Sequence, residues 1–328
     1  MTGMQERYIG FDWLRLIAAI GIVGCHLALP NMTDGAWLIK RFTDLNVGVF
    51  AAIAGFFMAY SFQLKNILSL LFLNRRVNRL LLPLYLWSLF YIGIDIVFDT
   101  LASKPLTFQP LSLSYWYSIL ICGNAATQTW FLIALFYTQV LLCGFIRKDF
   151  FTKRHWMTIG LTFLFVIGCI FSYQAGWWTY YFLRLFSFFL LGIAIFRARE
   201  GLQKIPLWAL GCLLLIGIIL IANGFKYGFL GECVVSIPML CLGLNWRPKN
   251  VRIQSVGQTL GALSFGVYLF HPVFTRIIGV IIAKLGLPSD VFVFLLDLAV
   301  ASGCSLMATW MLKCVIKRFP MFAVILPS

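Results

Sequence analysis

Long runs of apolar residues, many of them close to the length of a membrane span, recur along the whole sequence. A helix needs about 20 consecutive apolar residues to cross a bilayer, and only helices or closed barrels satisfy their backbone polar groups in lipid. Because these runs are long and continuous instead of short and alternating, they favour helices. The pattern predicts ten transmembrane helices at Ile9–Leu29, Leu45–Phe62, Leu80–Phe98, Thr129–Ile146, Trp156–Ser172, Trp178–Phe196, Pro206–Ala222, Tyr227–Leu244, Leu260–Ala283 and Val291–Val315.

The overall composition agrees with a membrane protein. Hydrophobic residues occupy 61% of the 328 positions and charged residues only 11%, and the mean hydropathy is +0.92. Soluble domains carry about 25% charged residues, so the composition excludes an ordinary soluble domain. We predict an all-α polytopic membrane protein, with one integral-membrane domain over residues 1–328.

The charged residues and the cysteines bear on the membrane topology and on the kinds of ligand that the protein binds. The net charge of +15 has a topological explanation, because basic residues collect in the cytoplasmic loops of membrane proteins. With the N-terminus in the cytoplasm, 18 of the 26 Lys and Arg residues fall in internal segments and five in external ones. We therefore expect both termini to be cytoplasmic and no nucleic-acid partner. The nine Cys residues show neither CxxC nor Cys/His spacing, so we expect no metal site.

The first predicted span carries three ionisable side chains, Asp12, Arg15 and His26, along one face. Arg15 and His26 lie within about 20° of the same face and about 16 Å apart along the axis. Ionisable residues inside a span usually face the protein interior or a wet cavity, so this pattern is typical of the wall of a functional channel. Two structural alternatives stay open. Asp12 and Arg15 can form an interfacial i,i+3 salt bridge, and His26 can be a hydrogen-bonded residue at the helix end.

A basic group lies at the inner end of the third predicted span, in the stretch NRRVNRLLLPLYLW. We call Arg75, Arg76 and Arg79 the arginine cluster. Arg76 and Arg79 are spaced i,i+3 and share a helix face. Guanidinium groups bind phosphate through paired N–H donors, so the cluster is a candidate phosphate site. It is also a candidate topology anchor, because Arg and Lys gather at the inner ends of spans.

A second intramembrane histidine, His271, directly precedes Pro272. Ionisable groups are rare within spans and often functional, which favours a role at a site. Alternatively, the imidazole bonds a carbonyl that the proline leaves without its helical N–H partner. Arg184 and Glu232 lie in two other predicted spans and can pair across helices for structure.

Several motifs resemble those of the membrane-bound acyltransferase-3 family, which acylates bacterial surface sugars. The opening FDWLRLIAAIGIVGCH is similar to the family's first helix, with its Arg-x10-His pattern on Arg15 and His26. RVNR is similar to the Arg-x-x-Arg motif, on Arg76 and Arg79. VGVFAAIAGFFMA is similar to the second-helix motif, although Ala-Gly at 54–55 replaces the frequent Ser-Gly, so a hydroxyl is missing.

The later part of the chain continues the resemblance. TWFLIALF is similar to the Trp-Phe-Leu motif, at Trp130. LGALSFGVYLFHPVF resembles the late Ser-Tyr-x-x-Tyr-Leu-x-His motif, on Ser264, Tyr268 and His271, with Phe265 at the usual tyrosine. The resemblance covers nearly the whole chain, in the family's order.

This resemblance implies ten core helices in the bacterial cytoplasmic (inner) membrane. It implies an acyl-CoA co-substrate from the cytoplasm and no tightly bound cofactor. The acyl group, acetyl by family frequency, passes to a hydroxyl of a cell-surface or lipid-linked sugar. The chain is too short for the extra periplasmic domain of some relatives, so it resembles the stand-alone form.

The resemblance and the residues together suggest roles for the candidate site. The CoA phosphates are expected to bind the arginine cluster, and the pantetheine arm to pass Arg15. His26 then acts as the general base that takes the proton of the sugar hydroxyl, while Asp12 orients Arg15. Trp130 and His271 are candidate substrate-binding residues.

Other functions stay open at this stage. A transporter or flippase for a lipid-linked glycan uses similar buried charges along its pathway, and a structural membrane subunit needs no chemistry. A related enzyme can carry another acyl group, such as succinyl. The sequence also leaves the oligomeric state open.

Overall fold

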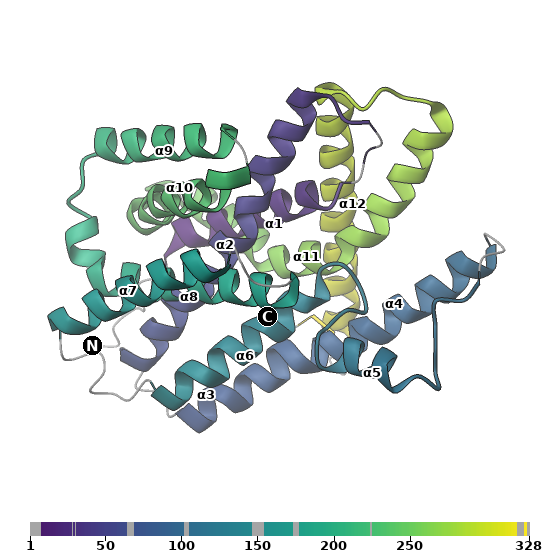
Figure 1. Cartoon of the computed structure of the whole chain (residues 1–328), viewed down its shortest axis with the longest axis horizontal. Helices are drawn as coiled ribbons and strands as arrows, with labels where there is room; N and C mark the ends of the chain where they lie inside the picture. Colours follow the sequence, from purple (N-terminus) through teal and green to yellow (C-terminus); the bar gives the residue numbers. More distant parts are fainter. Residues whose placement is uncertain are drawn as a thin grey trace.

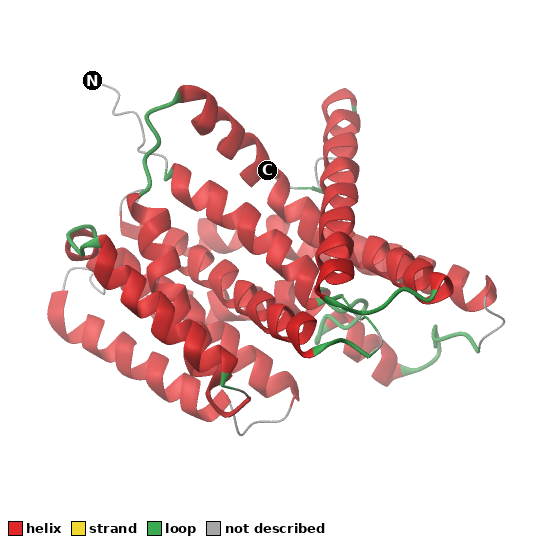
Figure 2. Cartoon of the chain, turned by 90° about the horizontal axis from the view of Figure 1, so that it is seen from above, coloured by secondary structure: helices red, strands yellow, loops and turns green. Residues whose placement is uncertain are grey.

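The computed structural model describes residues 8–27, 29, 31–63, 69–101, 105–145, 154–172, 177–223, 225–319 and 325–326. These residues form helices joined by loops, and they contain no strand (Figure 2). The helices labelled in Figure 1 are α1 (Ile9–Cys25), α2 (Asp34–Gln63), α3 (Ser69–Arg76), α4 (Leu82–Leu101), α5 (Leu113–Leu120), α6 (Thr129–Phe145), α7 (Arg154–Ser172), α8 (Trp177–Leu202), α9 (Leu207–Ala222), α10 (Phe225–Asn245), α11 (Val251–Leu285) and α12 (Val291–Arg318).

The predicted all-helical class is confirmed, and each of the ten predicted ranges overlaps a helix. Ile9–Leu29 runs past the end of α1 at Cys25, and Leu80–Phe98 begins in a π-helical turn before α4. Ile146, at the end of the fourth range, lies outside the described residues. Several helices are long and apolar enough to cross a membrane. Among the described residues these are Asp34–Gln63, Leu70–Leu101, Thr179–Leu202, Val251–Leu285 and Val291–Arg318. Shorter apolar helices lie at Thr129–Cys143, Ile159–Gly168, Leu207–Ala222 and Phe229–Asn245. Ten crossings and two cytoplasmic termini stay predictions.

Two helices extend well beyond the apolar runs that predicted them. α2 begins at Asp34 instead of Leu45, and α11 begins at Val251 instead of Leu260. Hydropathy marks the part of a helix that suits lipid, whereas backbone hydrogen bonding continues through polar residues. The ends follow local capping instead, since the Asn250 side chain accepts a backbone N–H of the first turn of α11.

α1 packs against α2, α10, α11 and α12, and Figure 1 shows it among these helices. Phe11, Ala18 and Ile22 on this helix are buried almost completely. Asp12 is also buried, at 5% exposure. The start of the polar face of α1 is therefore held within the protein, as is expected for an ionisable group in an apolar helix.

α2 and α8 pack at close range through small residues. A Cβ atom placed on Gly55 would lie 2.0 Å from the carbonyl oxygen of Phe189, and one placed on Gly192 would lie 1.8 Å from that of Ala52. Glycine at such positions lets helix backbones approach closely. This contact fixes α2, which forms one wall of the cavity described below.

α3 and α4 form one nearly continuous helix, joined by a π-helical turn at Val77–Leu81. In this turn the Leu82 N–H donates to the carbonyl of Val77. Pro83 has no N–H, so the ordinary α-helical bond to the carbonyl of Arg79 cannot form. The wider turn lies directly before the proline and carries Arg79, and such turns are frequent at functional sites.

Candidate functional site

A cavity of about 560 Å³ lies between α1, α2, the π turn, α6 and α11. This volume is in the usual range of ligand pockets. Its charged lining residues are Asp12, Arg15, Arg76 and Arg79. Its aromatic lining residues are Tyr8, Phe50, Phe57, Tyr60, Phe131, Phe265 and Tyr268. The cavity therefore brings the charged part of the first helix together with two members of the arginine cluster.

Asp12 and Arg15 form the i,i+3 ion pair that their spacing suggested, with 3.6 Å between Arg15 Nη1 and Asp12 Oδ1. The Arg15 guanidinium also lies over the ring of Phe57, 4.6 Å from its centre. Both members of the pair line the cavity. Asp12 thus holds the Arg15 guanidinium at the cavity surface, where a ligand can reach it. The ion pair therefore does more than stabilise the end of the helix.

The arginine cluster divides into two parts. Arg76 and Arg79 line the cavity, in agreement with a shared helix face. The Arg76 guanidinium lies 4.6 Å from the centre of the Phe72 ring, and its buried Nε has no hydrogen-bond partner among the described residues. Arg75 is exposed and is not among the described residues that line the cavity. The pair Arg76 and Arg79 can therefore hold an anion inside the cavity, whereas Arg75 lies outside it.

His26 and His271 stack on each other, although one lies directly after α1 and the other within α11. Their ring centres are 5.0 Å apart and their planes differ by 29°. His26 follows the last residue of α1 and is half-buried, whereas His271 is fully buried. Two different sequence motifs pointed to these two histidines. In the structure the two side chains form one histidine pair within the protein.

The alternative suggested for His271 is confirmed by its hydrogen bond. Its Nδ1 lies 2.7 Å from the carbonyl oxygen of Tyr268, which is the carbonyl that Pro272 leaves without a helical N–H partner. A carbonyl can only accept, so Nδ1 carries the proton. Nε2 is then an acceptor in the neutral ring, and it is buried without a partner among the described residues. A structural role at Nδ1 therefore leaves Nε2 available for another contact.

Tyr268 connects the cavity to the histidine pair. It lines the cavity, and its ring centre lies 6.1 Å from that of His271. The Tyr268 hydroxyl donates to the carbonyl of Gln128, which holds the ring in place. Neither His26 nor His271 is among the described residues that line the cavity, and Tyr268 links the cavity lining to His271.

Trp130 lies apart from the cavity lining. It is half-buried, and its ring centre is 5.0 Å from that of Tyr181 and 6.1 Å from that of Phe131. Phe131 does line the cavity. Trp130 therefore supports the cavity wall from behind instead of forming its surface.

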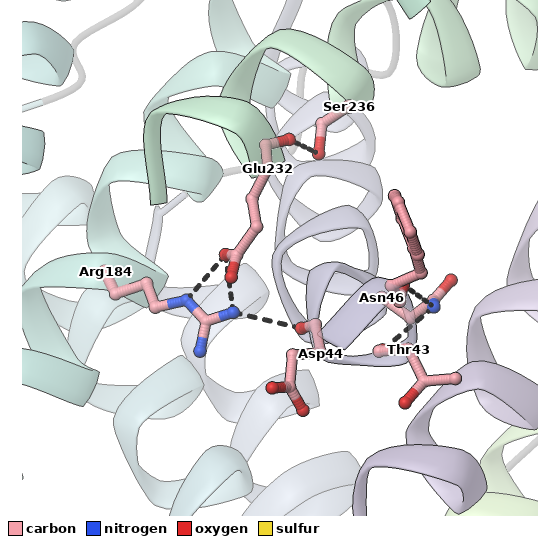
Figure 3. Close-up of polar contacts among 7 residues, drawn as sticks. Thr43, Asp44, Asn46, Arg184, Glu232 and Ser236 are labelled. Atoms are coloured by element: carbon pink, nitrogen blue, oxygen red, sulfur yellow. Dashed lines mark hydrogen bonds and ion pairs between the residues drawn. The ribbon is translucent and has the colours of Figure 1, made fainter. Parts of the chain in front are cut away.

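Arg184 and Glu232 pair across α8 and α10, as their positions suggested (Figure 3). Arg184 Nε and Nη2 donate to Glu232 Oε2 at 3.0 and 2.6 Å, and Nη2 also donates to the carbonyl oxygen of Asp44 at 3.0 Å. Both side chains are buried. This cluster ties three helices together away from the cavity, which indicates a structural role.

Lys40 lies close to the histidine pair and was missed by the sequence patterns. Its ammonium donates to the carbonyl of Leu27 at 2.7 Å, directly after His26. Hydropathy placed Lys40 in an external loop, because the predicted span began only at Leu45. The helical extension of α2 brings it back beside the end of α1, a contact that only the tertiary structure specifies.

Comparison with known proteins identifies the family of the chain. A family model described as an acyltransferase domain, that of the acyltransferase-3 family, matches residues 8–313. Searches of curated proteins and of solved structures found no match. The matched range contains the cavity, the arginine cluster and the histidine pair, and the chain therefore belongs to the acyltransferase-3 family of membrane acyltransferases.

Proposed function

We propose that this chain is an O-acyltransferase that moves an acetyl group from acetyl-CoA to a hydroxyl of a cell-surface or lipid-linked sugar. The family establishes acyl transfer at a membrane. The proposal adds the donor, the acyl group, the acceptor, the bacterial cytoplasmic membrane and the residues that act. The donor enters from the cytoplasm, at the end of the molecule where the arginine cluster lies.

One observation carries the proposal. A single cavity is lined by Arg76, Arg79 and Tyr268, and Tyr268 contacts His271, which stacks on His26. CoA has phosphates near one end and a reactive thioester at the other. Arg76 and Arg79 offer donors suited to phosphate, and the aromatic wall offers an apolar path for the pantetheine arm. The order of chemical groups in the ligand matches the order of residues from the arginines to Tyr268.

His26 is the general base of the proposed reaction. It is half-buried, so a substrate can reach it, whereas His271 is fully buried and bonds a carbonyl through Nδ1. As the sugar oxygen attacks the thioester carbon, His26 takes the hydroxyl proton. The new C–O bond forms, the C–S bond breaks, and the CoA thiolate takes the proton back from the imidazolium. His271 stacks against His26 and fixes the plane of its ring.

The acyl end of the donor passes Tyr268 to reach His26, because this ring links the cavity lining to His271 of the histidine pair. Phe50 lies beside it, with ring centres 6.4 Å apart. In the proposed mechanism these rings shift when the donor binds. Arg15, held by Asp12, lines the path and offsets the charge of the phosphates.

Binding of acetyl-CoA to the purified protein tests the donor site. Replacing both Arg76 and Arg79 by alanine removes charge-assisted hydrogen bonds of about 1.5–3 kcal/mol each. We therefore expect the affinity, measured by isothermal titration calorimetry, to fall about 100-fold or more. Arg75→Ala is the matched control, because Arg75 is exposed and outside the cavity lining.

The binding experiment also separates this proposal from a transporter of a lipid-linked glycan. A transporter needs no site for CoA, so an unmodified protein that does not bind acetyl-CoA contradicts the proposed donor. If Arg75→Ala and the double variant lose the same affinity for acetyl-CoA, the loss comes from the lower positive charge of the protein as a whole. Arg76 and Arg79 would then not be the phosphate site.

A further inference from the structure

A second cavity, of about 280 Å³, lies where the start of α1, the end of α10 and the start of α11 meet. The helix directions place it at the same end of the bundle as the charged part of the first cavity. Tyr8 lines both cavities. The residues that line the second cavity are Tyr8, Ile9, Leu244, Trp246, Arg247, Pro248, Gln254 and Gln258.

Trp246 gives this cavity a flat aromatic surface. Its side chain is 45% exposed and lines the cavity, and its ring offers a large apolar face. The ring of Trp13 packs against it, with ring centres 5.8 Å apart. One side of Trp246 is thus supported by the protein, while the exposed side faces a space in which a planar ring can stack.

Two glutamines supply the hydrogen-bonding edge. Gln254 donates from Nε2 to the carbonyl of Pro248 at 2.8 Å, which fixes its amide. Gln258 is half-buried and lines the same cavity, one helical turn after Gln254. A carboxamide offers one acceptor and two donors side by side, and this pattern matches the N6 amino group and the adjacent ring nitrogen of adenine.

We propose that the second cavity holds the adenine ring of acyl-CoA, stacked on Trp246 and read by the amide of Gln258. The inference rests on the proposed function, since it assigns the nucleotide end of that donor. Arg247, which also lines the cavity, is suited to the phosphate on the ribose. Past Tyr8, the diphosphate reaches Arg76 and Arg79, and the pantetheine arm follows the first cavity.

Comparison of two donors tests this assignment. Acetyl-CoA carries the adenine, whereas acetyl-4′-phosphopantetheine lacks it and keeps the thioester arm and one phosphate. Stacking on an aromatic side chain contributes to the binding of a base, so Trp246→Ala should weaken acetyl-CoA binding about tenfold and leave acetyl-4′-phosphopantetheine binding unchanged. Gln258→Ala should weaken acetyl-CoA alone in the same way, and Trp246→Phe should keep most of the affinity because it keeps the stacking surface.

Matched controls replace a tryptophan and a glutamine elsewhere. Trp208 is 73% exposed on α9, and Gln203 is exposed in the turn before it, so Trp208→Ala and Gln203→Ala should bind both donors like the unmodified protein. Acetyl-CoA binding that is unaffected in both Trp246→Ala and Gln258→Ala overturns the adenine site, while the donor proposal stands. Equal weakening of both donors also overturns it. An unmodified protein that binds neither donor contradicts the proposed function itself.

Discussion

The two stacked histidines illustrate, at the scale of single residues, how one side chain serves both the fold and the site. His271 holds the carbonyl of Tyr268 through Nδ1, and its Nε2 has no described partner. His26 beside it is more exposed. The sequence singled out each histidine separately, because helical periodicity specifies the face of a residue but not the side chain that meets it.

Two substitutions of His271 separate these roles. His271→Ala leaves a buried carbonyl unpaired, and we expect the free energy of unfolding to fall by about 1–3 kcal/mol. His271→Asn keeps a donor near the position of Nδ1, so it should stay close to the unmodified protein in stability and still transfer acetyl more slowly, because the ring stack and Nε2 are lost. Unfolding in a denaturant titration and initial transfer rates give the two readouts. An asparagine variant as active as the unmodified protein would limit His271 to a structural role.

Loss of the carboxylate should lower the free energy of unfolding more in the buried ion pair of Arg184 and Glu232 than in an exposed ion pair. Glu232→Gln leaves Arg184 as a buried, uncompensated charge, and breaking such a pair costs about 3–5 kcal/mol. Arg276 pairs with Asp95 at a more exposed position, so Asp95→Asn should cost about 1 kcal/mol or less. Denaturant titration of both variants provides the comparison. A loss in Glu232→Gln as small as that in Asp95→Asn would contradict a structural role for the buried cluster.

At the scale of helices, hydropathy located a helix in each predicted range but not the features that shape the site. The extension of α2 to Asp34 and the π turn at Val77–Leu81 both lie where the apolar signal is weak or uniform. A proline at 83 was visible in the sequence, yet a proline near a helix start is compatible with a regular helix. The π turn also lies against α6, and local sequence does not specify that contact.

The contact between α2 and α8 should be sensitive to a single methyl group. Gly55→Ala places a Cβ against the backbone of Phe189, and we expect a loss of about 1–3 kcal/mol in the free energy of unfolding. Gly93→Ala on α4 is the control. Nothing lies within 4 Å of a Cβ at that position, so it should be neutral or slightly stabilising, because alanine favours a helix. A Gly55→Ala variant as stable as the control would show that the two helices can separate without cost.

At the scale of the whole molecule, the sequence predicted the all-helical class, the approximate helical ranges and the four charged residues that line the cavity, Asp12, Arg15, Arg76 and Arg79. Hydropathy and the family motifs are sufficient for that, because α1 and the arginine cluster carry their charges in patterns that stand out from apolar surroundings. The position of Arg75 outside the cavity lining, the stacking of His26 on His271 and the second cavity at Trp246 depend on helix packing. No local pattern encodes which helices become neighbours.

The central claim is that His26 acts as the general base in the transfer of an acyl group to a surface sugar, and mass spectrometry of the surface polysaccharide tests it most directly. Cells that lack the gene would receive the unmodified chain, His26→Ala, or His155→Ala, which replaces the third histidine of the sequence. We predict acetyl groups on the polysaccharide with the unmodified chain and His155→Ala, and none with His26→Ala, although this variant reaches the membrane at the same level and binds acetyl-CoA. Polysaccharide that is equally acetylated with His26→Ala would contradict the account.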